Sequence, residues 1–254
     1  MKQSEGQRPP GLGALVQTHF TRLALAAGVL AGLAALLAGP AYRLGLLGLG
    51  GGLQTVRWAA TVAFVAAVMA ALALLLALAA RRRAGWALLA ALVLNLAVAG
   101  PPIALLWQAR HLPLIHDIST DTEHPPAFVA VLALRKNARN PVDWVPATGA
   151  AQRLAYPDIR PLHLDLAPAA ALARARTVAL AMGWDLVDVS EPDLRLEATA
   201  TTLLFGFKDD VVVRVTPQPS GCIVDIRSLS RVGSSDLGTN ARRVRNFLQR
   251  MSAG

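Results

Sequence analysis

The chain has 254 residues and is 54% hydrophobic, which is too apolar for an ordinary soluble domain. Its net charge of +9 is uneven: residues 1–107 hold eight Lys/Arg and one acid, and residues 108–254 hold 17 Lys/Arg and 15 acids. The basic excess belongs to the apolar half, where cations flank spans, so it does not indicate a nucleic-acid-binding protein, and no nucleic acid is expected as a partner.

Residues 1–22 are predicted to form a cytoplasmic tail, and Leu23–Tyr42 a first span, because it carries no charge over 20 residues. A signal peptide is the alternative, since Leu23–Ala38 has the length of an apolar h-region. Gly28 and Gly32 have the G-x-x-x-G spacing. This spacing either lets another helix approach closely or follows from the Ala- and Gly-rich composition of the segment.

Two further spans are predicted at Trp58–Ala80 and Ala84–Trp107, joined by a turn at Arg81–Arg83. Trp58–Ala80 has no charge over 23 residues. As a helix it extends about 35 Å, enough to cross a bilayer. Basic loops stay in the cytoplasm, so this turn predicts three crossings and a cytoplasmic N-terminus. We expect a multi-pass inner (cytoplasmic) membrane protein, with residues 23–107 as the anchor and residues 108–254 in the periplasm.

The C-terminal half combines strand-like and helix-like segments. The strand-like segments are Trp184–Val189, Leu194–Leu204, Asp210–Thr216 and Cys222–Ser230. The helix-like segments run from Pro125 to Ala133, over Ala169–Met182 and over Leu237–Met251. This order predicts an α+β fold, in which an antiparallel sheet carries helices on one face.

The last two strands alternate between apolar and charged residues. A turn at Pro217–Ser220 pairs Val213 with Val224 on the apolar face and Asp210 with Arg227 on the charged face. Slipping this register by one residue would bury the charges in the core. The alternation therefore predicts one apolar and one charged face for the sheet.

Several stretches of the C-terminal half resemble one family. They are His116–Thr122 with Pro125–Phe128, Tyr156–Ile159, and Gly206–Asp210 with Asp225–Gly233 and Asp236–Gly238. Together they are similar to the bacterial and plastid family called domain of unknown function 1499, over about residues 112–250. That family has no agreed activity. The resemblance therefore implies a fold unit and a location at the membrane, and it implies no reaction.

The charged sheet face is the first candidate site. Its residues are Asp210, Arg214, Asp225, Arg227, Ser228, Ser230 and Arg231. Its arginines, with the N–H groups around Ser234–Leu237, favour an anion or a polar ligand, although Asp236 opposes an anion there. The alternative is a solvated ladder of cross-strand ion pairs.

The second candidate is a metal site formed by His116, Asp117 and Asp121, with Glu123 and His124 nearby. Carboxylates suit hard cations, and histidines suit zinc. Their spacing matches no recognised ligand pattern. Turns and helix caps also use these residue types, and this is the alternative.

Catalytic motifs are absent from the sequence: it has no G-x-S-x-G, H-E-x-x-H, P-loop or C-x-x-C. We therefore predict no catalytic residue and no cofactor. The expected function is binding of a membrane or envelope protein, or of a polar ligand, near the lipid bilayer. The alternatives are a hydrolase-like envelope enzyme, using the charged sheet face or the His116–His124 segment, and an accessory subunit joined to another membrane protein through Gly28 and Gly32.

Overall fold

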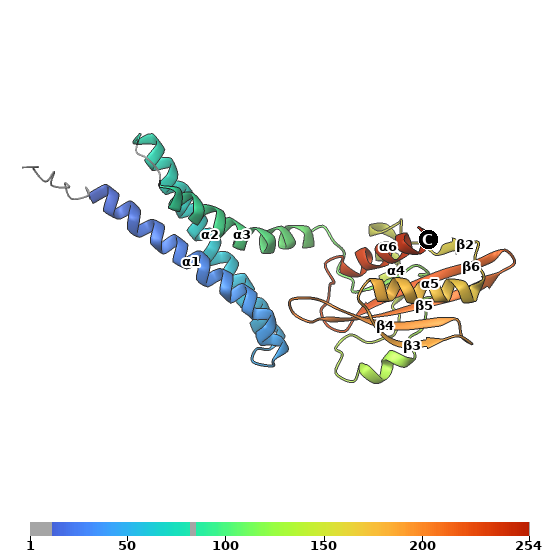
Figure 1. Cartoon of the computed structure of the whole chain (residues 1–254). Helices are drawn as coiled ribbons and strands as arrows, with labels where there is room; N and C mark the ends of the chain where they lie inside the picture. Colours follow the sequence, from blue (N-terminus) through green and yellow to red (C-terminus); the bar gives the residue numbers. More distant parts are fainter. Residues whose placement is uncertain (1–11, 82–84, 254) are drawn as a thin grey trace, which may run out of the picture. The chain divides into compact units, whose positions relative to one another are not determined.

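The computed structural model describes residues 12–81 and 85–253, and the chain divides into two compact units between Trp107 and Gln108 (Figure 1). Arg82 and Arg83 of the predicted cytoplasmic turn lie outside the described residues. Within the described ranges, the first unit consists of long helices, and the second contains a sheet with shorter helices. This arrangement confirms the predicted fold class.

Three helices of the first unit are long and apolar enough to cross a membrane. They are α1 (Leu12–Arg43), α2 (Leu49–Ala79) and α3 (Trp86–Ala109). Helix α1 begins before the predicted Leu23, so residues 12–22 are helical where a tail was expected. Large apolar side chains cover the outside of these helices, as in Leu30 and Leu76, which are 67% and 70% exposed. The chain is therefore a membrane protein.

The G-x-x-x-G pair of α1 packs against α3 of the same chain. A Cβ on Gly28 would lie 3.0 Å from Asn95 Nδ2, and one on Gly32 would lie 3.3 Å from Val98. The small residues let Asn95 Nδ2 donate a hydrogen bond to the Ala24 carbonyl oxygen of α1 at 2.9 Å. The buried amide therefore joins two spans within this chain.

The second unit is built on an antiparallel sheet with the strand order β1-β6-β5-β4-β3, and β2 also pairs with β6. Its strands are β1 (Asp117–Ser119), β2 (Leu162–Leu164), β3 (Asp185–Ser190), β4 (Arg195–Thr201), β5 (Lys208–Gln218) and β6 (Gly221–Ser230). Short strands β1 and β2 cover successive parts of one edge of β6. Strand β3 forms the opposite edge of the sheet.

Helices α5 (Pro168–Ala181) and α6 (Thr239–Ser252) pack on one face of the sheet (Figure 1). The carboxylate of Asp236 accepts hydrogen bonds from the N–H groups of Gly238, the N-cap residue, and Asn240 in the first turn of α6. The helix predicted from Pro125 to Ala133 is wrong. A short 3-10 helix, η1 (Ala130–Leu134), occurs there, and α4 (Pro146–Ala155) was not predicted.

The two faces of the sheet follow the predicted alternation, but the predicted register is wrong by two residues. Val213 pairs with Ile226 instead of Val224, and Val212 pairs with Arg227. A shift of two residues leaves every side chain on its own face. The hydrophobic pattern is therefore equally satisfied by both registers.

The turn between β5 and β6 determines the true register. Gln218 pairs with Gly221, so two residues form the turn instead of the predicted four. Gly221 has a φ of +97°, and a Cβ there would collide with the carbonyl oxygen of Leu164 at the end of β2. Only glycine suits both this conformation and this close approach.

The main core lies between the sheet and the helices α5 and α6. It includes Val211 and Val213 of β5, each fully buried, and Ala175 of α5. Trp184 and Phe247 stack with ring centroids 5.5 Å apart. This face of the sheet is held by apolar contacts.

Candidate functional site

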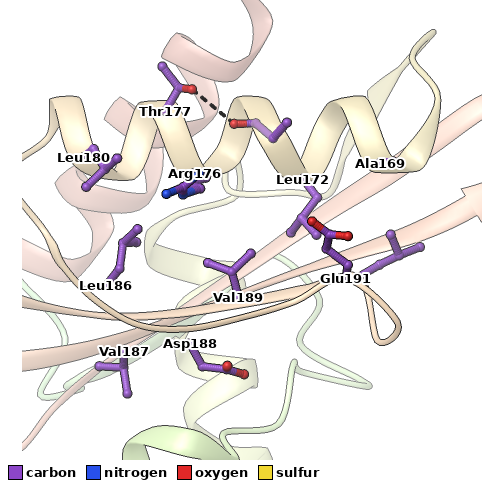
Figure 2. A pocket seen from close by; sticks show the side chains of 12 residues that line it. Ala169, Leu172, Arg176, Thr177, Leu180, Leu186, Val187, Asp188, Val189 and Glu191 are labelled. Carbon is purple, nitrogen blue, oxygen red and sulfur yellow. Dashed lines mark hydrogen bonds between the residues drawn. The ribbon is translucent and has the colours of Figure 1, made fainter.

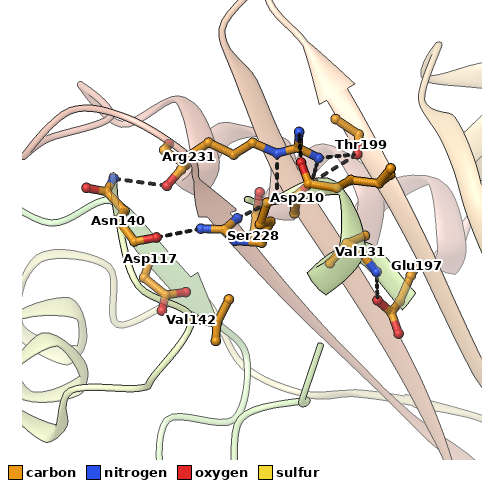
Figure 3. Close-up of polar contacts among 12 residues, drawn as sticks. Asp117, Val131, Asn140, Val142, Glu197, Thr199, Asp210, Ser228 and Arg231 are labelled. Atoms are coloured by element: carbon orange, nitrogen blue, oxygen red, sulfur yellow. Dashed lines mark hydrogen bonds and ion pairs between the residues drawn. The ribbon is translucent and has the colours of Figure 1, made fainter. Parts of the chain in front are cut away.

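The charged sheet face is buried, because residues 120–145, here called the covering segment, pass over it. Asp210 is fully buried and Arg227 is 3% exposed. Its polar side chains bind residues of both the sheet and the covering segment, and Figure 3 shows several of these contacts. The pairs of Asp210 and Arg227 therefore do not belong to a solvated ladder, whereas the cross-strand pair of Arg214 with Asp225 is partly exposed.

Arg227 of β6 is bound on all sides. Its Nε and Nη2 donate to the two carboxylate oxygens of Asp117 in β1, at 3.0 and 2.7 Å. It also donates to carbonyl oxygens of the covering segment, those of Pro126 and Val142. The rings of Phe128 and Trp144 lie 5.0 and 5.3 Å from the guanidinium carbon. The guanidinium thus holds the covering segment on the sheet.

Asp210 of β5 binds two arginines. Arg231 donates to both carboxylate oxygens, at 2.9 and 2.7 Å, and Arg135 of the covering segment forms an ion pair with the same carboxylate. Thr199 of β4 donates its hydroxyl to Asp210 at 2.9 Å. Figure 3 shows Arg231, Thr199 and Asp210 converging on one point above the sheet. A fully buried carboxylate is stable here because it is paired and hydrogen-bonded.

Arg214 lies at the more open rim of the same face, with 33% of its side chain exposed. Its Nη2 donates to Asp225 at 2.9 Å and to Asp121 of the covering segment at 3.0 Å. The hydroxyl of Thr120 donates to the other oxygen of Asp225 at 2.9 Å. The rim therefore repeats the pattern of the buried part, in which an arginine joins a strand to the covering segment.

Glu197 of β4 determines where η1 begins. Its fully buried carboxylate accepts hydrogen bonds from three consecutive N–H groups, those of Val129, Ala130 and Val131. Arg195 donates to the same carboxylate at 2.9 Å. A distant strand thus supplies the negative charge that the start of a helix favours.

Ser228 and Ser230 lie on the opposite face, because side chains alternate along β6. Both serines bind the side chain of Asn240 in α6, at 2.8 and 3.0 Å. Arg243 of the same helix donates to Ser228 and to Asp209, at 2.9 and 2.6 Å. The structure therefore does not bring the two serines together with the arginines of the predicted site.

The three predicted metal ligands have no common centre. Asp117 is bound by Arg227, and Asp121 is bound by Arg214 and by the N–H groups of Glu123 and His124. Among the described residues, no group of three or more His, Cys, Asp or Glu side chains could hold a metal ion. The carboxylates are instead used in ion pairs and in a turn.

A groove of about 740 Å³ lies between α5 and the edge strand β3, and the sequence did not predict it. Figure 2 shows Leu172 and Leu180 of α5 facing Leu186 and Val189 of β3 across this space. The pairing of β3 with β4 shifts between Leu186 and Asp188. This irregularity breaks the simple alternation of the strand and brings both apolar side chains toward the helix.

The groove also carries charges of both signs. Arg176 belongs to α5 on one side of the groove, and Glu191 belongs to the turn after β3 on the other. Strand β3 pairs with β4 alone among the described strands, so its outer edge offers unpaired backbone groups. The sequence signal for this edge was only the position of β3 as the first strand of a meander.

A comparison with known protein families finds one whose model matches residues 117–251, described as "Protein of unknown function (DUF1499)". The match covers more than half of the chain. The chain belongs to the DUF1499 family. None of the curated proteins compared with the chain matches it.

The most specific DUF1499 stretch of this chain, Asp225–Gly233, is largely used to hold the fold together. Arg227 binds the covering segment directly, Asp225 binds Arg214, which contacts the same segment, and Arg231 binds Asp210. Its serines hold α6 through Asn240. The ligand-binding role of these residues stays a prediction, and what the geometry shows is that their polar groups bind one another.

Two carboxyl groups of this DUF1499 domain illustrate how burial and hydrogen bonding compete. Desolvation raises the pKa of Asp117, and the Arg227 guanidinium opposes this effect. Desolvation also acts to raise the pKa of Asp121, but the N–H groups of His124 and Glu123 and the cation of Arg214 outweigh it, so the pKa of Asp121 is lowered. The half-buried rim carboxylate of Asp121 is therefore held in its charged form.

Proposed function

We propose that this DUF1499 protein is a multi-pass protein of the inner (cytoplasmic) membrane that presents its C-terminal unit to the periplasm. Three helices able to cross a membrane support an odd number of crossings. Arg81 and its two neighbours in the sequence support a cytoplasmic turn between α2 and α3. Alkaline phosphatase fused after residue 254 should be active, and green fluorescent protein fused there should be dark. The opposite pair of results would contradict the proposal.

We further propose that the periplasmic unit binds an extended segment of a membrane or envelope protein along the groove between α5 and β3. The observation that carries this proposal is the combination of an apolar groove with an unpaired strand edge beside it. An added strand takes its affinity from main-chain hydrogen bonds and its specificity from side chains that enter alternate pockets. Leu180 and Leu186 supply the apolar pocket. Arg176 and Glu191 favour side chains of opposite charge in the bound segment on either side of this pocket.

The polar network favours binding over catalysis. A general acid or base needs access to its substrate. In this unit Asp210 and Glu197 are fully buried, and arginines bind both carboxylates. Backbone N–H groups also bind the carboxylate of Glu197. The carboxylates of the charged face therefore act in folding, and the groove is the surface left open for a partner.

The test uses a displayed library of random peptides, selected against the full chain in lipid nanodiscs. Selected peptides should protect the amides of β3 from hydrogen exchange, because strand addition fills its open edge. Leu180→Asp should abolish their binding, since it places a charge in the groove at a residue that is 52% exposed and so not needed for folding. Ser220→Asp, in the turn between β5 and β6, is the matched control and should bind normally.

Two results would contradict the groove as the binding site. One is a library that yields no peptide above background. The other is a set of peptides that bind Leu180→Asp as well as they bind the native chain and leave the exchange of β3 unchanged.

A further inference from the structure

The hairpin between β4 and β5 ends in an exposed apolar tip, residues 202–207. Strand β4 stops at Thr201, before the predicted end at Leu204, and the chain turns there. Leu203 is 94% exposed and Leu204 is 41% exposed. Large aliphatic side chains displayed together at the end of a hairpin are costly in water, so a partner surface is expected for them.

The tip has a defined structure beneath these leucines. The Thr202 N–H donates to the Phe207 carbonyl oxygen at 2.8 Å, and the Phe207 N–H donates to the Thr202 hydroxyl at 2.9 Å. Gly206 has a φ of +66°, and its N–H donates to the Thr202 carbonyl oxygen at 3.0 Å. The rings of Phe205 and Phe207 stack with centroids 5.1 Å apart. The leucines are therefore held outward by a rigid turn.

The tip lies at the end of the unit where the chain arrives from α3. The Ser230 N–H donates to the His116 carbonyl oxygen at 3.0 Å, and Ser230 pairs with Asp209 at the start of β5. Two strand spacings, about 10 Å, thus separate the arriving chain from the base of the hairpin. Residues 110–116 connect α3 to β1, and seven residues extend at most about 25 Å. This end of the unit is therefore the one that the seven-residue connection joins to α3.

The exposed charges around the tip are mainly basic. Lys208 stands at its base, and the Arg231 N–H donates to the Lys208 carbonyl oxygen at 3.0 Å. The Arg139 N–H donates to the Arg231 carbonyl oxygen at 2.9 Å, so exposed Arg139 and Lys136 belong to the same end. Asp185 is an exposed acid there. The opposite end of the sheet carries the exposed acids Asp165, Glu191 and Asp193.

We propose that the tip of the β4–β5 hairpin docks into the surface of the bilayer that holds the three spans. Leu203 and Leu204 enter the boundary between headgroups and acyl chains, and Lys208, Lys136 and Arg139 contact the phosphates of anionic lipids. The occupant is the membrane because the tip combines apolar side chains, a basic surround and a tether of seven residues. The proposal is independent of the groove, and it holds on either side of the membrane.

The experiment places an environment-sensitive fluorophore on Leu203→Cys of the full chain, reconstituted in vesicles of phosphatidylcholine and phosphatidylglycerol. The matched control is Ser220→Cys at the other end of β5. Native Cys222 is 1% exposed, so the unmutated chain measures background labelling. The label at position 203 should show blue-shifted emission and quenching by nitroxide-labelled lipid, and the label at position 220 should show neither.

The charged part of the proposal is tested in the same system. Omitting phosphatidylglycerol should reduce the quenching at position 203, and so should Lys208→Gln in vesicles that contain it. Quenching that is independent of both would overturn the contacts with anionic headgroups.

Two results would overturn docking itself. Equal quenching at positions 203 and 220 would show that the tip has no special contact with lipid. A blue shift at position 203 without quenching by the nitroxide lipid would show that protein covers the tip instead of the membrane.

Discussion

The two faces of the sheet are both buried, but they are held by different interactions. The face toward α5 and α6 is aliphatic and aromatic, with Val213 and Phe247 fully buried. The face under the covering segment holds the buried charges of Asp210, Glu197 and Arg227 beside a smaller apolar cluster. Alternation along a strand thus tells which residues share a face, and it does not tell whether water reaches that face.

The difference predicts different responses to substitution. Burial of apolar side chains stabilises a fold even when they are exchanged for others of similar volume. In a buried ion pair, the attraction between the charges roughly offsets the cost of removing them from water. Loss of one partner is strongly destabilising, because it leaves the other charge buried and unpaired. The apolar face should therefore contribute most of the stability of the unit. The polar face should determine where the covering segment lies.

The largest expected effect comes from placing a charge on the apolar face. Val213→Asp should destabilise the C-terminal unit by about 4 kcal/mol or more, because the new carboxylate has no partner in the core. Urea unfolding of the full chain in nanodiscs, followed by pulse proteolysis, measures this loss. Leu154→Asp, at a residue that is 87% exposed, is the control and should behave like the native chain. A stable Val213→Asp variant would refute the assignment of the two faces.

Breaking a pair on the polar face comes next. Arg227→Ala should cost about 3–5 kcal/mol, because it leaves the buried carboxylate of Asp117 without its cation. The double variant Asp117→Leu with Arg227→Met should recover much of this loss, since both charges are then removed. The same urea assay gives all values. A double variant no more stable than Arg227→Ala would mean that the cation acts chiefly through Phe128 and Trp144.

The smallest effect concerns the rim. The pKa of Asp121 is lowered from 3.8 in the folded state, so the unfolded chain binds its proton first as the pH falls. The stability contributed by this carboxylate is fully present above the pKa of Asp121 in the unfolded chain. It is lost as the pH drops through the lower pKa of the folded state. Asp121→Asn should therefore be less stable than the native chain at pH 7, by less than about 1 kcal/mol, and the two should converge below pH 3.8. A constant difference down to acid pH would contradict an ionic contribution.

Local patterns were sufficient to predict the elements with strong periodicity. The charge-free runs predicted the spans, the apolar spacing predicted α5 and α6, and period-two alternation assigned Val213 and Asp210 to opposite faces. The register was missed because a shift of two residues keeps that assignment. The residue that resolves it is Gly221, whose positive φ shortens the turn.

Interactions between distant segments were beyond local patterns. The helix predicted from Pro125 to Ala133 does not form, and the N–H groups of residues 129–131 bind the carboxylate of Glu197. This residue lies 66 to 68 positions further along the chain. Helix α4 was missed because it is only 10 residues long, contains Gly149 and begins without a side-chain cap. It is held in place by Gln152, which bonds to the backbone of Ser119. The burial of the candidate site was missed for the same reason, since no local signal shows that residues 120–145 cover its arginines.

The long separation between partners on the polar face has a consequence for biogenesis. Asp117 is synthesised 110 residues before Arg227, and Thr120 is synthesised 105 residues before Asp225. A growing chain therefore carries these groups hydrated and unpaired until β6 has emerged, and the unit cannot close earlier. Chaperones and proteases that meet the nascent chain encounter a segment whose docking surface does not yet exist.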